Sequence, residues 1–329
     1  KDAAMEGALS FAVETAQNAF KAAKEAPTWA KAALAAAALM ALREAYLSVT
    51  EKSVEGEVCL ITGAGSGIGR MLAKSMAAGG AKVALLDINE AAAKEAAAEI
   101  AASGGHAFAA RCDVTSHEDV AVAVAAAREA LGSDITILVN NAGVVSGKPL
   151  LETSDRAIKR TFDVNVIAHY WTLKECLPSM VRNNHGHVVT VASAAGWVGI
   201  PRQCDYSASK WAANGLAEAL RMELRHMGAT GVSTTCVCPF YIDTGMFEGV
   251  RGSWLPTLPI LKPDYVVASM MTAIRRRTPV LNMPAMVNLT PLMRAGLPVA
   301  AFDWCCDFLG ITKSMDDFAG RSIDAPGSS

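Results

Sequence analysis

From residue 57 onward, short runs of apolar residues alternate with longer segments in which apolar residues recur at helical spacing. The apolar runs predict six buried strands, within VCLIT, KVALLD, AFAARCDV, ITILVNNAG, HVVTVAS and VSTTCVCP. Segments such as GIGRMLAKSMAAGG, NEAAAKEAAAEIAASGG and HEDVAVAVAAAREALG lie between them and predict helices. This alternation is typical of a parallel sheet with crossover helices on both faces. We therefore predict one α/β domain, with a doubly wound parallel sheet, over residues 54–282.

Two regions flank this domain. Residues 1–53 are rich in alanine and predict two helical segments, separated at Pro27. The uncharged run 32–42 in the second segment is shorter than the about 20 residues that span a bilayer. Residues 1–53 therefore lie on a membrane, dock on a protein partner, or pack as a hairpin on their own core. The tail, 283–329, is apolar but interrupted by prolines, which favours short helices.

Composition narrows the class of protein. Apolar residues make up 52% of the chain and the net charge is −2, which argues against a nucleic-acid partner held by bulk electrostatics. The low charged fraction, 19%, favours a membrane surface or a protein partner. None of the eight cysteines forms a C-x-x-C pair, so we expect no metal site. Reduced, structural cysteines imply an intracellular compartment.

The stretch LITGAGSGIGR follows the first predicted strand and opens the first helix. Its glycines Gly63, Gly67 and Gly69 permit a tight turn and close approach of the backbone to a pyrophosphate. The helix N-terminus offers free N–H groups to the anion. Asp87 ends the second strand, where a carboxylate can accept hydrogen bonds from a ribose and repel a 2′-phosphate. The sequence therefore predicts a Rossmann-type site for NAD(H) rather than NADP(H), although Asp87 could instead cap the next helix.

A second candidate site lies in VASAAGWVGIPRQCDYSASK. If the segment from Tyr206 is a helix, Lys210 lies one turn beyond Tyr206 on the same face. We expect the ammonium to lower the pKa of the phenol, so that the tyrosine can act as an acid or base. The alternative is an ordinary amphipathic helix with a solvated lysine.

These motifs occur together in the order found in the short-chain dehydrogenase/reductase family, which the chain resembles over roughly residues 54–320. The shared motifs are TGAGSGIG, NNAG, the asparagine of FDVNVIAHYW, Ser193 and YSASK. VASAAG, NNHGHVVTVAS, TTCVCPFYIDTGMFEG and LPILKPDY are similar to the branch of type 10 and epidermal retinol dehydrogenases and type 11 and 13 17β-hydroxysteroid dehydrogenases.

The resemblance implies roles for four residues. Tyr206 is expected to be the general acid/base, and Lys210 to hold the nicotinamide ribose. Ser193 is expected to bind the substrate oxygen, and Asn165 to anchor a water that links Lys210 to solvent. The cofactor-binding residues that the resemblance and the glycine turn imply are Thr62, Gly63, Ser66, Gly67, Ile68, Gly69, Asp87, Asp113, Val114, Asn141, Ala142, Gly143, Tyr206, Lys210, Pro239, Ile242 and Thr244.

The expected function is NAD-dependent interconversion of an apolar alcohol (a retinoid, steroid or other lipid) and its carbonyl. The expected substrate walls are residues 194–202 and 246–261, the second of which carries a tryptophan, several aliphatic residues and prolines. Where the family often has Pro-Gly, this chain has Pro239-Phe240, so Phe240 could narrow the nicotinamide end or form a wall. A different class remains open, namely a cofactor-binding accessory subunit of a larger membrane-associated assembly.

The resemblance also implies a location in the cell and a mode of assembly. It implies a peripheral membrane protein of the endoplasmic reticulum or lipid droplet, and a homodimer formed through the helices at about 152–183 and 206–228. Residues 1–53 stand where relatives carry a short hydrophobic anchor. Import into an organelle such as the mitochondrion is therefore the alternative location.

Overall fold

The structure, a computed structural model, describes residue 14 and residues 27–320. The chain forms two compact units, Lys1–Ser53 and Val54–Ser329. The first helical segment expected before Pro27 lies, apart from Glu14, outside the described residues. The second is confirmed as α2 (Thr28–Val49). None of the helices within the described residues is long and apolar enough to cross a membrane.

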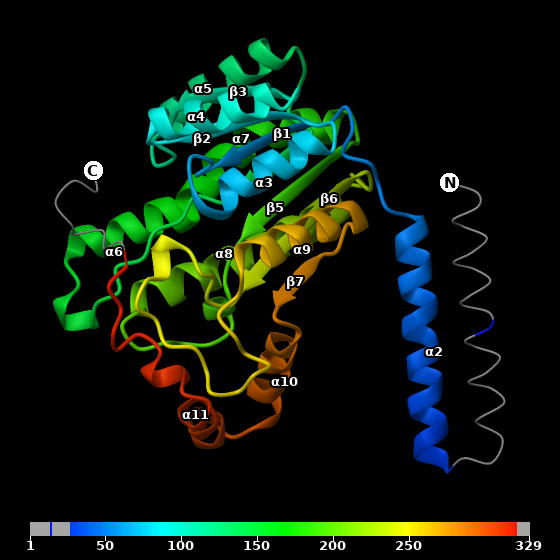
Figure 1. Cartoon of the computed structure of the whole chain (residues 1–329), viewed down its shortest axis with the longest axis vertical. Coiled ribbons are helices and arrows are strands. Elements are labelled where there is room, and N and C mark those ends of the chain that lie inside the picture. The colour runs from blue at the N-terminus through cyan, green and yellow to red at the C-terminus, as the bar shows by residue number, and fades with distance from the viewer. Residues whose placement is uncertain (1–13, 15–26, 321–329) are drawn as a thin grey trace. The chain divides into compact units, whose positions relative to one another are not determined.

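The Val54–Ser329 unit is built on a seven-stranded parallel sheet with the order β3-β2-β1-β4-β5-β6-β7 (Figure 1). The strands are β1 (Val58–Thr62), β2 (Lys82–Asp87), β3 (His106–Arg111), β4 (Ile137–Asn140), β5 (Gly186–Val191), β6 (Val232–Pro239) and β7 (Val280–Met283). The predicted fold class and the six predicted strands are confirmed. The seventh strand was not predicted, because β7 is a four-residue edge strand that is only partly buried and lacks a continuous apolar run.

Helices cover both faces of the sheet. One buried apolar cluster joins the sheet to α3 (Gly67–Ala78), α4 (Glu90–Ala102) and α9 (Pro263–Arg276). A second cluster, on the other face, joins it to α5 (His117–Leu131), α7 (Ala168–Arg182) and α8 (Cys204–His226). Side chains buried on both faces explain why the strands read as continuous apolar runs in the sequence.

The segment before α7 departs from regular α-helix. The helix α6 (Asp155–Phe162) continues into a π-helical turn, Asp163–Ile167, and only then into α7. Such turns widen the helix locally and are frequent at functional sites. Asn165 lies in the middle of this turn.

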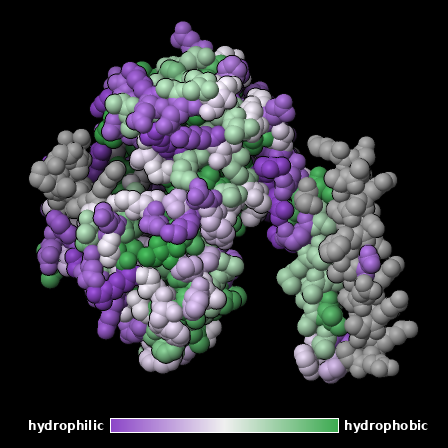
Figure 2. All heavy atoms as spheres, viewed as in Figure 1, coloured by the Kyte–Doolittle hydropathy of each residue, from purple (hydrophilic) through white to green (hydrophobic). Residues whose placement is uncertain are grey.

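The C-terminal part of the unit folds as the short helices that its prolines predict, α10 (Leu289–Gly296) and α11 (Val299–Phe308). Residues 311–320 then pack against the loop that follows β6. The Arg251 N–H donates to the Ser314 carbonyl at 2.8 Å, and the Ala319 N–H donates to the Glu248 carbonyl at 2.9 Å. Figure 2 shows hydrophobic residues at the surface of this part of the unit. The expected tail is therefore packed against the loop expected to line the substrate site.

Candidate active site

The strand order reverses between β1 and β4, and the loops after these two strands are joined by hydrogen bonds. The Thr62 hydroxyl accepts hydrogen bonds from the backbone N–H groups of Asn141 (3.0 Å) and Ala142 (3.1 Å). The Asn141 amide donates to the carbonyls of Thr62 (2.9 Å) and Gly63 (3.1 Å). In open α/β sheets, ligands bind in the crevice at such a reversal. Thr62, Asn141 and Ala142 therefore lie at the edge of the sheet where a ligand is expected.

The glycine turn after β1 is shaped by close contacts that a side chain would block. Gly63 and Gly67 have φ angles of +64° and +54°, in the left-handed region that favours glycine. A Cβ on Gly69 would collide with the Gly63 carbonyl oxygen and lie 2.5 Å from the Asn141 Nδ2 atom. Ser66 precedes α3 without capping it through its side chain, so the first N–H groups of α3 have no side-chain acceptor there.

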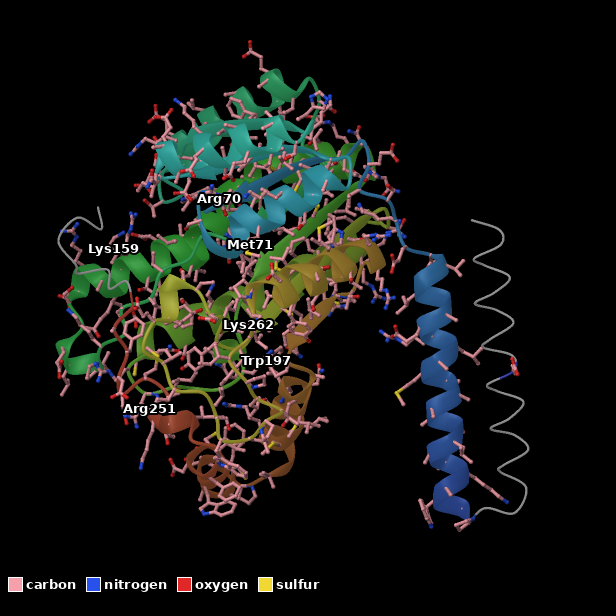
Figure 3. The ribbon with its side chains drawn as sticks, in the orientation of Figure 1. Arg70, Met71, Lys159, Trp197, Arg251 and Lys262 are labelled. Atoms are coloured by element: carbon pink, nitrogen blue, oxygen red, sulfur yellow. The ribbon has the colours of Figure 1, made fainter. Side chains whose placement is uncertain are left out.

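Ile68 packs against the core, while Arg70 and Met71 lie on the first turns of α3 (Figure 3). A Cβ on Gly67 would meet nothing within 4 Å, so the space beside the start of α3 is open. An uncapped helix start beside open space fits a pyrophosphate. The glycine turn and the start of α3 therefore suit a dinucleotide.

Asp87 lies at the end of β2 and faces the glycine turn. Its carboxylate accepts the Gly65 N–H at 2.8 Å and the Asn89 N–H at 2.9 Å. The helix α4 is capped by the Asn89 side chain, which accepts the Ala92 N–H at 3.1 Å. The alternative in which Asp87 caps α4 is therefore wrong.

Asp113 and Val114 follow β3, on the neighbouring strand end. The Asp113 carboxylate accepts hydrogen bonds from the Thr115 hydroxyl (2.7 Å) and N–H (3.0 Å), and Arg160 lies 3.6 Å away. Burial raises the pKa of Asp113, but these hydrogen bonds and the Arg160 charge lower it by more, so its net pKa is below the ordinary value. Val114 is buried beside it.

Tyr206 and Lys210 lie one turn apart in the first half of α8, as predicted. Both are buried, and the Lys210 Nζ lies 5.6 Å from the centroid of the Tyr206 ring. Lys210 donates a hydrogen bond to the Val191 carbonyl at 2.9 Å, at the end of β5. The alternative of a solvated lysine is therefore wrong.

The sequence predicted that the pKa of Tyr206 is lowered, and this prediction is wrong for the chain by itself. Burial raises the pKa of the phenol above its ordinary value, and the hydrogen bond with Ser193 opposes this rise only in part. The same burial lowers the pKa of Lys210 to about 8, although the Cys236 and Cys238 thiols act in the opposite direction. Desolvation is the largest cause of both pKa changes, because both groups lie in the interior.

Asn165 is fully buried and connects three parts of the site. Its Oδ1 accepts the Val144 N–H at 2.9 Å, and its Nδ2 donates to the Val144 carbonyl (2.9 Å) and the Ser209 hydroxyl (3.0 Å). A Cβ on Gly143 would lie 3.5 Å from Asn165 Oδ1 and 3.6 Å from Lys210 Nζ. The loop after β4 therefore passes within van der Waals distance of both side chains at Gly143.

Ser193 lies two residues after the end of β5, and its side chain contacts Pro239 at the end of β6. Its hydroxyl accepts the Ala195 N–H at 3.1 Å and donates to the Pro239 carbonyl at 3.4 Å. In the segment after β6, Ile242 pairs with Leu261, and Thr244 precedes the short helix Gly245–Phe247.

A run of aromatic rings leads from this segment to the tyrosine. The Phe247 ring lies edge-on to Tyr206 at 5.9 Å and to Tyr241 at 5.2 Å, and Tyr241 contacts Phe240 at 4.8 Å. Phe240 is therefore part of a buried aromatic wall. Trp197 adds to the apolar surroundings from the loop after β5, held by a 3.0 Å hydrogen bond to Asn282 (Figure 3).

Several residues of the site were not predicted. Gly65 binds Asp87, Ser209 binds Asn165, and Asp205 accepts hydrogen bonds from Ser146 and Thr161, both at 2.7 Å. Phe318, from the C-terminal segment, lies against Gly147. Gly65 and Ser209 stand inside motifs that the sequence displays, whereas the other contacts join residues far apart in the chain and leave no local signal.

Known proteins are similar to this chain in sequence and in fold. Residues 57–253 match the short chain dehydrogenase family. The chain is 41% identical to human epidermal retinol dehydrogenase 2 over 86% of this chain and 92% of that protein. It is 40% identical to human retinol dehydrogenase 10, over 84% of this chain and 88% of that one. A solved short-chain dehydrogenase/reductase from Burkholderia phymatum, in complex with NAD, is 30% identical and superposes with a TM-score of 0.67 over 74% of this chain and 95% of its own.

Proposed function

This chain belongs to the short-chain dehydrogenase/reductase family, it is an oxidoreductase that acts on CH–OH groups, and we propose that it interconverts an apolar alcohol and its carbonyl with NAD. The observation that carries the proposal is the convergence of Ser193, Tyr206 and Lys210 beside an apolar, aromatic wall. A retinoid is our first candidate substrate, because the similar human proteins are named retinol dehydrogenases. Steroids and other lipid alcohols are the next.

Tyr206 is the proposed acid/base. In oxidation, its phenolate takes the hydroxyl proton of the alcohol, and in reduction its hydroxyl returns that proton. Ser193 and Tyr206 are hydrogen-bonded to each other, so both hydroxyls can form hydrogen bonds with the same substrate oxygen. Because burial raises the pKa of the phenol, a cation must act close to it to make the phenolate accessible.

Lys210 is the proposed source of that positive charge. Its pKa of about 8 leaves most of its ammonium charged at neutral pH and lets it exchange a proton near that pH. We propose that Asn165 acts beside it by fixing the loop after β4 and by anchoring water, since its side chain binds that loop and α8 together.

The cofactor is proposed to be NAD rather than NADP. When bound, the nicotinamide ring supplies the acceptor or donor of the hydride. Asp87 supports the choice, because its carboxylate faces the glycine turn, would accept ribose hydroxyls and would repel a 2′-phosphate. Thr62, Gly63, Ser66, Gly67, Ile68, Gly69, Asp113, Val114, Asn141, Ala142, Gly143, Pro239, Ile242 and Thr244 are the proposed remaining contacts.

An apolar substrate is supported by the walls of the site. Phe247 contacts the Tyr206 ring, and the loops after β5 and β6 and the C-terminal segment add further partly buried hydrophobic residues that pack on the same core cluster, namely Trp197, Met246, Leu255, Ile260 and Phe318. The other class, an accessory subunit in which the cofactor is structural, is less well supported, because such a subunit does not need a buried lysine and tyrosine at this spacing.

The test measures NADH formation by the purified chain with NAD⁺ and all-trans-retinol, estradiol or a long-chain alcohol, with NADP⁺ in parallel. Tyr206→Phe should abolish most turnover and leave NADH binding nearly intact. Tyr265→Phe, at an exposed tyrosine of α9, is the matched control and should keep wild-type turnover. Tight NADH binding without turnover of any of these alcohols would favour the accessory subunit.

We also propose an intracellular, peripheral membrane location and a homodimer or larger complex. Trp29, Leu39 and Met40 are exposed on α2, and Tyr170 and Trp211 are partly exposed on α7 and α8. Flotation with lipid vesicles tests the first proposal. Light scattering of the purified chain tests the second.

A further inference from the structure

His169 is a buried histidine whose ring makes no hydrogen bond within the described part of the chain. It lies on α7, one helical turn after Asn165, and its side chain is 2% exposed. Neither Nδ1 nor Nε2 has a hydrogen-bond partner. A buried polar atom without a partner costs about 1–3 kcal/mol, so two such atoms on one ring need an explanation.

β4, which α7 contacts, carries another buried polar atom without a partner among the described residues. Thr172, one turn further along α7, donates its hydroxyl to the Asn140 Oδ1 at 2.7 Å, and the Asn140 Nδ2 is also buried and unpaired. Asn140 is the last residue of β4, immediately before the loop that contacts Asn165 and Lys210. His169 on α7 and Asn140 on the contacting strand β4 therefore carry three buried polar atoms that have no partner among the described residues.

Lys210 is the charged group that acts on His169. Burial, and secondarily the Lys210 charge, lower the pKa of His169 to about 3. The ring is therefore neutral at physiological pH, with one nitrogen as donor and the other as acceptor. A neutral acceptor can receive a hydrogen bond from water without competing with Lys210 for the proton.

We propose that His169 is a positioning residue of the proton path, which holds ordered water between α7 and Lys210. Buried water typically makes about three hydrogen bonds to polar groups that lack other partners, and the His169 ring and the Asn140 amide supply such groups. The inference rests on the proposed catalytic roles of Tyr206 and Lys210, and it adds a side chain that stands in FDVNVIAHYW but for which the sequence predicted no role.

The proton balance of the path is simple. For each alcohol oxidised, one proton passes from the Tyr206 hydroxyl toward Lys210, and one proton leaves Lys210 to water. Both residues then return to their starting protonation states. His169 neither gains nor loses a proton, and its unprotonated nitrogen only orients the water that accepts from Lys210.

Three variants of the full chain test the proposal. His169→Phe removes both ring nitrogens at similar size, His169→Gln retains an amide donor and acceptor, and His226→Gln changes an exposed histidine of α8 as the control. With NAD⁺ and all-trans-retinol, His169→Phe should lower kcat by roughly tenfold and raise the solvent deuterium isotope effect. His169→Gln should recover part of the rate, and His226→Gln should match the wild type.

Stability and cofactor binding separate this role from a structural one. Because His169→Phe keeps a ring of similar size, its thermal midpoint should stay close to that of the wild type, and its NADH affinity should stay within about twofold. Wild-type kcat and isotope effect in a folded His169→Phe would overturn the proposal. If that variant does not fold, failure of His169→Gln to alter the isotope effect overturns it.

A readout without turnover keeps the inference distinct from the proposed function. A high-resolution crystal structure of the wild-type chain with NADH should show water within hydrogen-bond distance of a His169 ring nitrogen. A ring packed without water there would overturn the inference, even if the chain oxidises retinol. Water at the ring in a chain that oxidises none of the tested alcohols would support the site and count against only the proposed substrate.

Discussion

The side-chain amide of Asn165 donates a 3.0 Å hydrogen bond to the hydroxyl of Ser209, the residue immediately before Lys210. Ser209 in turn donates to the Tyr206 carbonyl at 2.7 Å. The π-helical turn before α7 is thereby tied to the turn of α8 that carries both Tyr206 and Lys210. This contact joins segments 44 residues apart and connects the π-helical turn to the proposed catalytic pair.

Ser209→Ala should lower the free energy of unfolding by about 1–3 kcal/mol, because it leaves an Asn165 donor buried without an acceptor. We expect turnover to fall with it, while NADH binding changes less. Urea unfolding and steady-state kinetics measure the two effects. Thr272→Ala, at an exposed position of α9, is the control and should change neither. An unchanged unfolding midpoint for Ser209→Ala would show that the contact is not stabilising.

Gly69→Ala should weaken NADH binding by at least roughly tenfold and destabilise the fold by about 1–3 kcal/mol. The added Cβ would press on the Gly63 carbonyl and on the Asn141 amide, which together shape the glycine turn. Gly215→Ala is the matched control, because a Cβ there meets nothing within 4 Å, and it should stabilise α8 by up to about 1 kcal/mol. Fluorescence titration with NADH and thermal unfolding check both variants. Equal NADH affinity in the two would refute the steric argument.

Asp87→Asn should shift the preference between cofactors toward NADP⁺. The amide oxygen can still accept the Gly65 N–H, so the variant removes the negative charge and keeps the hydrogen bond. We expect the ratio of kcat/KM for NAD⁺ to that for NADP⁺ to fall by roughly tenfold, which is about 1.4 kcal/mol. Asp264→Asn, on the exposed first turn of α9, should leave the ratio unchanged. A ratio that does not move in Asp87→Asn would remove Asp87 from cofactor selection.

Lys210 should make the stability of the wild type rise with pH between about 8 and 10.5. Its pKa is lowered to about 8 in the folded chain against 10.5 for the ordinary group, so in this window the unfolded chain binds more protons. Below pH 8 the free-energy cost of burying the charged Lys210 is fully present. This cost disappears as the pH rises and the lysine becomes neutral in the folded chain and then in the unfolded chain.

The comparison with Lys210→Met isolates this contribution. The wild type should gain roughly 3 kcal/mol over the variant between pH 7.5 and 10.5, as measured by urea unfolding of both proteins. Lys262→Met, at an exposed lysine, should show no such gain. Parallel stability curves for the wild type and Lys210→Met would contradict the lowered pKa.

The sequence by itself determined the features that depend on local spacing. Apolar runs between helical segments set the parallel sheet, and the Tyr206–Lys210 interval put both side chains on one face of α8. The glycine turn and Asp87 stand at the ends of adjacent strands because parallel strands finish at the same edge. Each of these follows from periodicity over a few residues, which the sequence displays directly.

Tertiary structure decided what depends on burial and on contacts between distant segments. The sequence indicated that Lys210 would lower the Tyr206 pKa, but desolvation reverses that direction, and burial is set by the whole fold. The β7 strand, the Asn165–Ser209 contact and the C-terminal segment over the loop after β6 also lacked a local pattern. The unpaired ring of His169 belongs to the same group, since an absent hydrogen bond can be recognised only when every neighbour is in place.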